Sequence, residues 1–194
     1  MWIALAEAAP EARGRDLALR HRYGDPAAFE EVYRRHADMV FSLALRMSGD
    51  REVAADLSQE TFLRIYRHLG RFRGRSSLKT WIYRVTVNCC RSKLRRQGRR
   101  RLERGIEESA QRLEDLADER AGPEQRALGH DLGRRLTEAM AELPIAFREA
   151  VVLRDVHGLS YAEIGEVLGV RVGTVRSRLA RGRERLRRRL EEGA

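Results

Sequence analysis

The sequence predicts an all-α protein of two small helical domains joined by an acidic flexible linker. β-branched residues are sparse and fall inside patterns of helical period. Charge is gathered in blocks: residues 71–101 hold twelve basic and no acidic residues, and residues 171–190 hold nine arginines and one acid. Between them, residues 102–133 hold nine acids and four arginines. We therefore expect an N-terminal extension over 1–24, a first domain over 25–97, a linker over 98–130 and a second domain over 131–194.

Composition excludes several classes of protein. Hydrophobic residues make up 42% of the 194 residues and charged residues 35%, which is typical of a globular chain with a core. No apolar run approaches the roughly 20 residues that span a bilayer, so we expect no membrane insertion and a cytoplasmic protein. The two cysteines, Cys89 and Cys90, are adjacent and lack neighbours at zinc-ligand spacing, which argues against a disulfide framework or a metal.

Catalytic patterns are also missing from the sequence. It has no Ser-His-Asp set, no phosphate-binding loop and no paired carboxylates suited to a metal, and its five histidines are scattered. We therefore expect a protein that is not an enzyme, with no catalytic residue and no cofactor.

The net charge of +10 and its two basic blocks favour a polyanionic partner. Each phosphate that Arg or Lys neutralises releases condensed counterions, so acid-free basic blocks are typical of nucleic-acid binding. A solvated charged face normally mixes signs. A basic amphipathic helix on a membrane surface is another physical possibility, and a membrane- or RNA-binding helical protein is the more distant alternative.

The start of the first domain is marked by capping residues. Residues 1–24 are weakly patterned and predict a partly helical or frayed extension. Asp25 followed by Pro26 predicts a helix start. The apolar pattern that follows fits one long helix or two stretches that meet near 36–38. Gly49 ends this run and Asp50 can cap the next helix.

The helix expected over 51–69 has two distinct faces. Ala54, Leu57, Thr61, Ile65 and Leu69 follow core spacing. The other face carries Asp56, Gln59, Glu60, Leu63 and Arg67. Its mixture of acids, an amide and an apolar side chain fits a partner-binding surface or an ordinary polar face equally well.

A basic loop over 70–77 leads to a helix that starts near Leu78, capped by Ser76 or Ser77. On this helix one surface line holds Trp81, Arg84, Asn88, Arg91 and Arg95. A Trp at helical spacing is more often a core residue. Together with Phe72 in the loop and the acid-free charge, however, this line predicts a surface that stacks on bases and holds the phosphates of a single strand.

The second domain carries helix-turn-helix spacing. Ser160 and Glu163 form a capping box, Gly165 permits close helix crossing and Gly169 makes the turn. The second helix is expected over 172–190. Its outward and N-terminal side chains are placed to enter a major groove, where Arg pairs with guanine: Arg171, Thr174, Arg176, Ser177, Arg178 and Arg181.

Several segments together resemble the extracytoplasmic-function group (group 4) of bacterial sigma-70-type sigma factors. They are Asp-Leu-Ser-Gln-Glu-Thr-Phe-Leu-Arg-Ile-Tyr (56–66), Phe-Arg-Gly-Arg-Ser-Ser-Leu-Lys-Thr-Trp-Ile-Tyr-Arg (72–84), Leu143-Pro144, Gly-Leu-Ser-Tyr-Ala-Glu-Ile-Gly (158–165) and Gly-Thr-Val-Arg-Ser-Arg-Leu (173–179). The resemblance spans about 29–96 and 136–190.

The resemblance implies a promoter-specificity subunit of RNA polymerase. The first domain would be sigma region 2, which binds the β′ clamp helices and opens the −10 element. Asp56, Gln59, Glu60 and Leu63 would contact core polymerase. Phe72, Arg73, Ser76 and Ser77 would capture flipped bases, and Lys79, Thr80, Trp81, Arg84 and Asn88 would hold the melted strand, in line with Arg91 and Arg95.

The second domain would be region 4, which reads the −35 element and meets the β flap. The linker would follow the path of the RNA, and an anti-sigma factor would mask both domains. The leading alternative is a stand-alone helix-turn-helix regulator, because the C-terminal pattern also fits such output domains.

Overall fold

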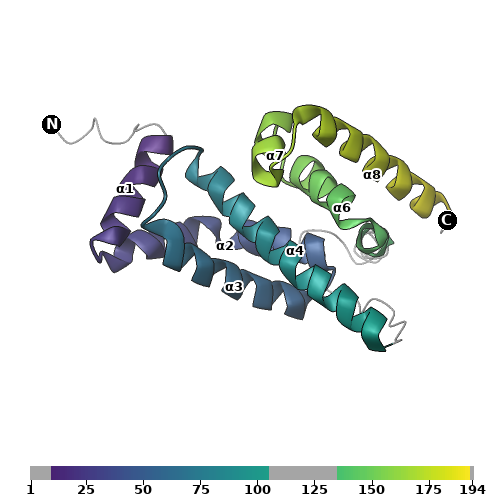
Figure 1. Ribbon diagram of the computed structural model, residues 1–194, viewed down its shortest axis with the longest axis horizontal. Helices are drawn as coiled ribbons and strands as arrows, with labels where there is room; N and C mark the ends of the chain where they lie inside the picture. Colours follow the sequence, from purple (N-terminus) through teal and green to yellow (C-terminus); the bar gives the residue numbers. More distant parts are fainter. Residues whose placement is uncertain (1–9, 105–134, 193–194) are drawn as a thin grey trace, which may run out of the picture.

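The computed structural model describes residues 10–104 and 135–192, and all regular structure in these ranges is helical (Figure 1). The first domain contains α1 (Pro10–Arg22), α2 (Pro26–Ser48), α3 (Arg51–Leu69) and α4 (Leu78–Arg104). The predicted all-α fold of two helical domains is confirmed. Because α4 continues to Arg104, the first residues of the expected linker are helical, and the rest of that segment lies outside the described residues.

The caps expected from the sequence define α2 and α3. Asp25 caps α2 by accepting a hydrogen bond from the amide of Ala27, and α2 runs unbroken to Ser48, so one long helix forms. Gly49 follows in the left-handed conformation, with φ of 74°. Asp50 then caps α3 through the amide of Val53. These caps fix the turn that brings α3 back along α2.

The extension is more ordered than expected. It contains α1, whose Leu17 and Ala18 are buried against Val32, Phe72 and Leu78. Of the two alternatives expected for residues 1–24, a partly helical extension is the one observed over Pro10–Arg22, where the helix is packed and not frayed. The weak apolar pattern concealed it, because α1 buries few side chains, chiefly Leu17 and Ala18.

The second domain has a helical stretch over 135–142, followed by α6 (Ile145–Val151), η1 (Val152–Val156), α7 (Tyr161–Leu168) and α8 (Val172–Glu192). The capping box of Ser160 and Glu163 forms, and Gly169 turns the chain with φ of 68°. A Cβ on Gly165 would lie 2.9 Å from the carbonyl oxygen of Val170, so a glycine is needed at this close approach. The helix-turn-helix expected from the sequence is present in α7 and α8.

The two domains pack together (Figure 1). One apolar cluster joins Met47, Val87 and Cys90 of the first domain to Leu153 and Ile164 of the second. Both cysteines are fully buried and free, and burial raises the pKa of Cys90 to about 12. In the described chain, no helix is both long and apolar enough to cross a bilayer.

Candidate nucleic-acid interface

The α3–α4 loop, residues 70–77, and the start of α4 form a basic hollow of about 310 Å³, here called the loop hollow. It is lined by Arg71, Phe72, Arg73, Arg75, Ser76, Trp81 and Arg84. Five of these seven were expected at the −10 site, and the structure brings them together. Arg71 and Arg75 were missed as site residues, although the basic block over 71–101 pointed to them.

Phe72 occupies the floor of the loop hollow. It is only 8% exposed, and its ring centroid lies 5.6 Å from that of Trp81. Trp81 itself is half-buried. Trp81 is therefore the more accessible aromatic side chain, while Phe72 mainly supports it.

Ser77 and Thr80 form the start of α4. The Ser77 hydroxyl accepts a hydrogen bond from the Thr80 amide at 3.0 Å, and the two hydroxyls lie 2.8 Å apart. Thr80 is 5% exposed. This pair fixes where α4 begins, as the predicted Ser cap implied, and so fixes the direction in which Trp81 and Arg84 project.

The second domain engages two of the five residues on the predicted α4 line. Arg91 donates through Nε and Nη2 to the two carboxylate oxygens of Glu149, at 2.8 and 2.7 Å. Arg84 donates through Nε to the carbonyl oxygen of Glu166 at 3.2 Å. Asn88 and Arg95 are exposed, as is Lys79, whose Nζ lies 6.0 Å from the Tyr83 ring centroid.

The Arg91–Glu149 pair is buried on its carboxylate side. The Glu149 side chain is 1% exposed, and the hydrogen bonds to it raise the pKa of Arg91. Next to it, buried Arg148 donates through Nη1 to the Met47 carbonyl oxygen at 2.6 Å. His157 packs edge-on against Tyr83, with ring centroids 5.4 Å apart.

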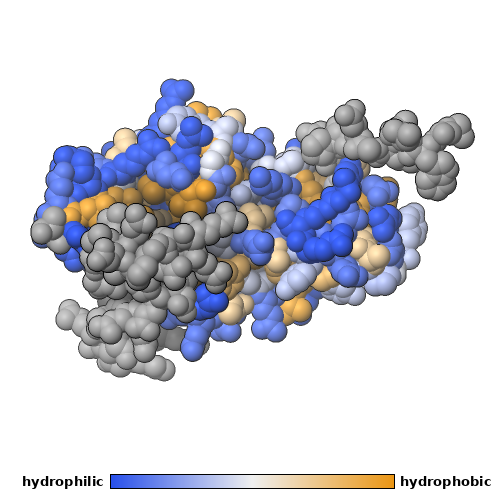
Figure 2. All heavy atoms as spheres, turned by 180° about the vertical axis from the view of Figure 1, so that it is seen from behind, coloured by the Kyte–Doolittle hydropathy of each residue, from blue (hydrophilic) through white to orange (hydrophobic). Residues whose placement is uncertain are grey.

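Helix α8 presents the residues expected at the −35 site. Arg171, Arg176, Ser177 and Arg181 are exposed, and Thr174 and Arg178 are half-buried. The carbonyl oxygen of Arg171 accepts hydrogen bonds from the amides of Thr174 and Val175, which starts the helix. Figure 2 shows one face of the molecule, where hydrophilic side chains cover much of both domains.

The arginines of α8 fall into two groups. Arg171, Arg176, Arg178 and Arg181 have no side-chain ion pair or hydrogen bond to any residue within 10–104 or 135–192. Further along, Arg183 pairs with Asp155, Arg187 with Glu184 and Glu191, and Arg189 with Glu142. Arg171, at the start of α8, and Arg176, Arg178 and Arg181 in its first half therefore offer uncompensated guanidinium groups. Most arginines of the second half are paired with carboxylates, and Arg185 lies over the Phe147 ring instead.

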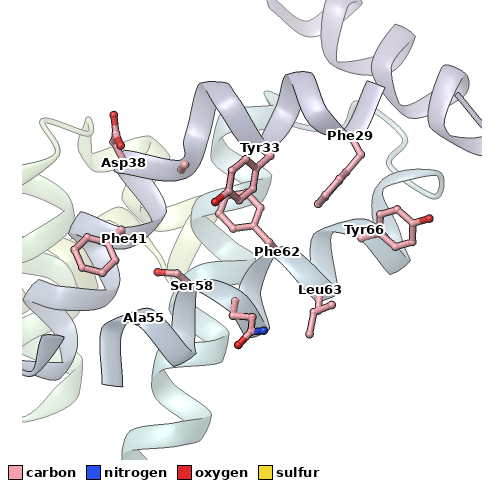
Figure 3. Close-up of a pocket in the computed structure, with 11 residues that line it drawn as sticks. Phe29, Tyr33, Asp38, Phe41, Ala55, Ser58, Phe62, Leu63 and Tyr66 are labelled. Carbon is pink, nitrogen blue, oxygen red and sulfur yellow. The ribbon is translucent and has the colours of Figure 1, made fainter. Parts of the chain in front are cut away.

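A second hollow, of about 740 Å³, lies between α2 and α3 (Figure 3). We call it the aromatic groove; its lining includes Phe29, Tyr33, Phe41, Gln59, Phe62, Leu63 and Tyr66. Tyr33, Leu63 and Tyr66 are each at least half exposed. An exposed apolar patch of this kind is typical of a binding site.

The groove contains two of the four residues expected to contact core polymerase, Gln59 and Leu63. Asp56 instead pairs with Lys93 at 3.4 Å, and Glu60 pairs with Arg64. The aromatic lining was missed, because Phe29 and Tyr33 share the period of the core residues of α2. Tyr66 follows Leu63 by three residues on the same face of the helix, and this spacing could have indicated the aromatic lining.

Comparison with known proteins agrees with this geometry. Residues 32–100 match the family Sigma-70 region 2, and residues 133–186 match Sigma-70, region 4. The ECF RNA polymerase sigma factor SigE of Mycolicibacterium smegmatis is 44% identical over 169 residues, 84% of this chain; the chain spans 63% of that relative's length.

Two further proteins extend the comparison. The RNA polymerase sigma-H factor of Pseudomonas aeruginosa is 33% identical over 180 residues, which cover 90% of this chain and 92% of that one. The structure of the sigma factor RpoE from Bartonella quintana, solved with the anti-sigma factor NepR, superposes with a TM-score of 0.69 at 23% identity, over 84% of this chain and 96% of that one. The chain belongs to the extracytoplasmic-function (ECF) sigma factors of the sigma-70 family.

Proposed function

We propose that this chain directs core RNA polymerase to promoters and uses three separate surfaces to do so. The first half of α8 reads duplex DNA at the −35 element. The loop hollow and the α4 line capture the melted strand at the −10 element. The aromatic groove holds core polymerase. The division of the α8 arginines into unpaired and paired groups is the observation that carries this proposal.

The unpaired arginines support major-groove reading by α8. A guanidinium already bonded to a carboxylate must break that pair to bind DNA, whereas a free one does not. Arg pairs bidentately with the O6 and N7 atoms of guanine, and each such contact contributes about 1–3 kcal/mol of discrimination. Arg176 and Arg178 stand in the first two turns of the helix, where a recognition helix meets the bases.

The loop hollow supports capture of an unstacked base. Arg71, Arg73 and Arg75 have no side-chain partner within the described chain, so their charge is available to phosphates. Trp81 offers an aromatic surface beside them. Extruding a base costs a few kcal/mol, and stacking contributes about 1–3 kcal/mol per base, so a cationic hollow with one ring can offset much of that cost.

The aromatic groove supports binding of a helical partner by core polymerase. Exposed Tyr33, Leu63 and Tyr66 supply apolar side chains to the groove (Figure 3). Gln59 and Asp38 add polar groups to its lining. Apolar anchors surrounded by polar groups are typical of an interface with a helix. We assign the β′ clamp helices to this groove, with Asp56 and Glu60 at its margin, and assign the β flap to the second domain.

Binding of the −10 strand along the α4 line requires the second domain to leave α4. Arg91 must break its two hydrogen bonds to the Glu149 carboxylate before it can bind a phosphate, and Arg84 must give up the bond from its Nε to the Glu166 carbonyl oxygen to turn fully toward the strand. We therefore expect the packed form to be the resting one and the separated form to act in the polymerase. An anti-sigma factor, as in the Bartonella quintana complex, is the expected partner that holds a resting form.

A stand-alone helix-turn-helix regulator is the competing function, because the free arginines of α8 alone would suit it. Transcription in vitro from a genomic promoter library separates the two. We expect selective transcripts only when the chain and core polymerase are both present. Tight, selective duplex binding without core polymerase, with no selective transcription, would favour the regulator.

A further inference from the structure

Helix α1 contacts the α3–α4 loop through several side chains, and this contact has no part in the function proposed above. Arg22 donates to the carbonyl oxygen of Gly70 through Nε at 2.7 Å and through Nη2 at 2.5 Å. In the same turn of α1, the His21 Nε2 lies 2.8 Å from the Tyr66 carbonyl oxygen. Two carbonyl groups at the end of α3 are thus held by the basic last turn of α1.

The first half of α1 contacts the loop further along. A Cβ on Gly14 would lie 2.9 Å from Leu78 Cβ and 3.4 Å from the Phe72 ring, so α1 lies directly against the floor of the loop hollow. Arg15 lies on the backbone of Gly74, since its Cγ and Cδ are 2.7 Å from where a Cβ on Gly74 would stand. Gly74 has φ of +67°, a conformation that a glycine adopts without strain.

The loop has few other restraints at this point. Arg71 and Phe72 donate backbone hydrogen bonds to His68 and Leu69, but residues 73–76 make no backbone-to-backbone hydrogen bond within the described chain. Their placement depends on side-chain contacts, and α1 supplies those on one side. Arg73, Arg75 and Ser76, which line the loop hollow, lie in this stretch.

We propose that α1 is a positioning element for the α3–α4 loop, with Arg15 and Arg22 as its positioning residues. They hold the backbone of residues 70–76 so that the loop hollow is already formed before a base enters it. A loop that is ordered in advance loses less conformational entropy on binding, so its ligand binds more tightly. The inference rests on the proposed role of the hollow at the −10 element, but its structural part can be tested without DNA.

The first experiment measures amide hydrogen exchange in the full-length free protein. The test variant is R15A/R22A. The control is R13A, which removes an exposed arginine from the same helix whose partner, Glu31, lies on α2 at 3.3 Å. We expect exchange in residues 71–76 to be about tenfold faster in R15A/R22A and unchanged in R13A. Equal exchange in the test variant and the wild type would overturn the proposal.

The second experiment measures binding of the reconstituted holoenzyme to a fork template whose −10 non-template strand is single-stranded. We expect R15A/R22A to bind about tenfold more weakly, R22K to recover part of the loss, and R13A to match the wild type. Core polymerase binding and the melting temperature should stay the same. If R15A/R22A lowered fork binding, core polymerase binding and the melting temperature together, α1 would have a purely structural role and the proposal would be overturned.

The exchange experiment tests the effect of α1 on the loop, and the fork-binding experiment tests the role of the loop hollow at the −10 element. If wild-type holoenzyme fails to bind the fork while exchange still accelerates in R15A/R22A, the role of the hollow at the −10 element is wrong. In that case the −10 part of the inference is overturned, and only the effect of α1 on the loop stands.

Discussion

Arg91 of α4 and Glu149 of α6 form a two-point ion pair across the domain contact, with N to O distances of 2.8 and 2.7 Å. The pair is asymmetric. The Arg91 side chain is 25% exposed and the Glu149 side chain 1%, so only the glutamate depends wholly on its partner for solvation in the packed form.

This asymmetry predicts different effects of the two partners. In R91M, the packed form would bury an unpaired carboxylate, at a cost of about 3–5 kcal/mol, so we expect the domains to separate instead. In E149Q the amide keeps the packing and part of the hydrogen bonding, and separation should be smaller. The radius of gyration from small-angle scattering measures both. An R91M protein as compact as the wild type would contradict the role given to this pair.

Acid should also weaken the domain contact through His157. Burial, with Lys79 and Arg46 nearby, lowers the pKa of His157 from 6.5 to about 4, and its buried Nε2 has no hydrogen-bond partner among residues 10–104 and 135–192. Burial disfavours the His157 cation in the packed form. The contribution of neutral His157 to the stability of the domain contact is therefore complete above pH 6.5 and is lost as the pH falls toward 4.

Fluorescence transfer between dyes on the two domains measures this loss. We expect the transfer efficiency to fall between pH 6.5 and 4 in the wild type, and to fall less in H157Q. Burial lowers the pKa of His36 on α2 as well, so H36Q serves as the control. Identical pH profiles for the wild type and H157Q would exclude His157 as the sensitive group.

The free and paired arginines of α8 should differ in their effect on promoter choice. R178A should reduce discrimination at the −35 element by about 1–3 kcal/mol. R187A removes an arginine that already pairs with Glu184 and Glu191, so it should have little effect. Competition between matched and altered −35 duplexes for the holoenzyme measures this. A uniform loss on all sequences in R178A would make it a phosphate contact.

Two glycines of α8 predict opposite changes in stability. Alanine favours a helix over glycine by up to about 1 kcal/mol, and a Cβ on Gly173 meets nothing within 4 Å, so G173A should stabilise the protein. A Cβ on Gly182 would lie 2.8 Å from Val151 Cγ2. G182A should therefore destabilise the protein, although alanine favours the helix there too. Thermal unfolding measures both. A rise in melting temperature for G182A would show that α6 and α8 do not pack as described.

Local signals in the sequence predicted the helices well. Asp25, Asp50 and Ser160 act on amides two or three residues away, so their capping roles could be recognised without the fold. Five of the six buried positions of α3 followed from period alone, and only Phe62 was missed. The second helix of the helix-turn-helix begins at Val172 as predicted.

Contacts between distant segments could not be predicted in this way. Arg91 and Glu149 are 58 residues apart, and nothing local to either shows that they pair. The same holds for Arg22 and Gly70. Helical period places the α4 line on one face, but the sequence could not show that the second domain contacts Arg84 and Arg91 of that line.

On the function proposed above, this chain opens promoters only as a subunit of RNA polymerase. Permanganate reactivity of unpaired thymines around the −10 element tests it most directly, on a promoter selected from the transcription library. We predict strong reactivity with core polymerase and the wild-type chain, none with either alone, and a large loss in W81A at unchanged duplex binding. Strand opening by the chain alone, or no opening with core polymerase, would show that the chain does not open promoters as a polymerase subunit.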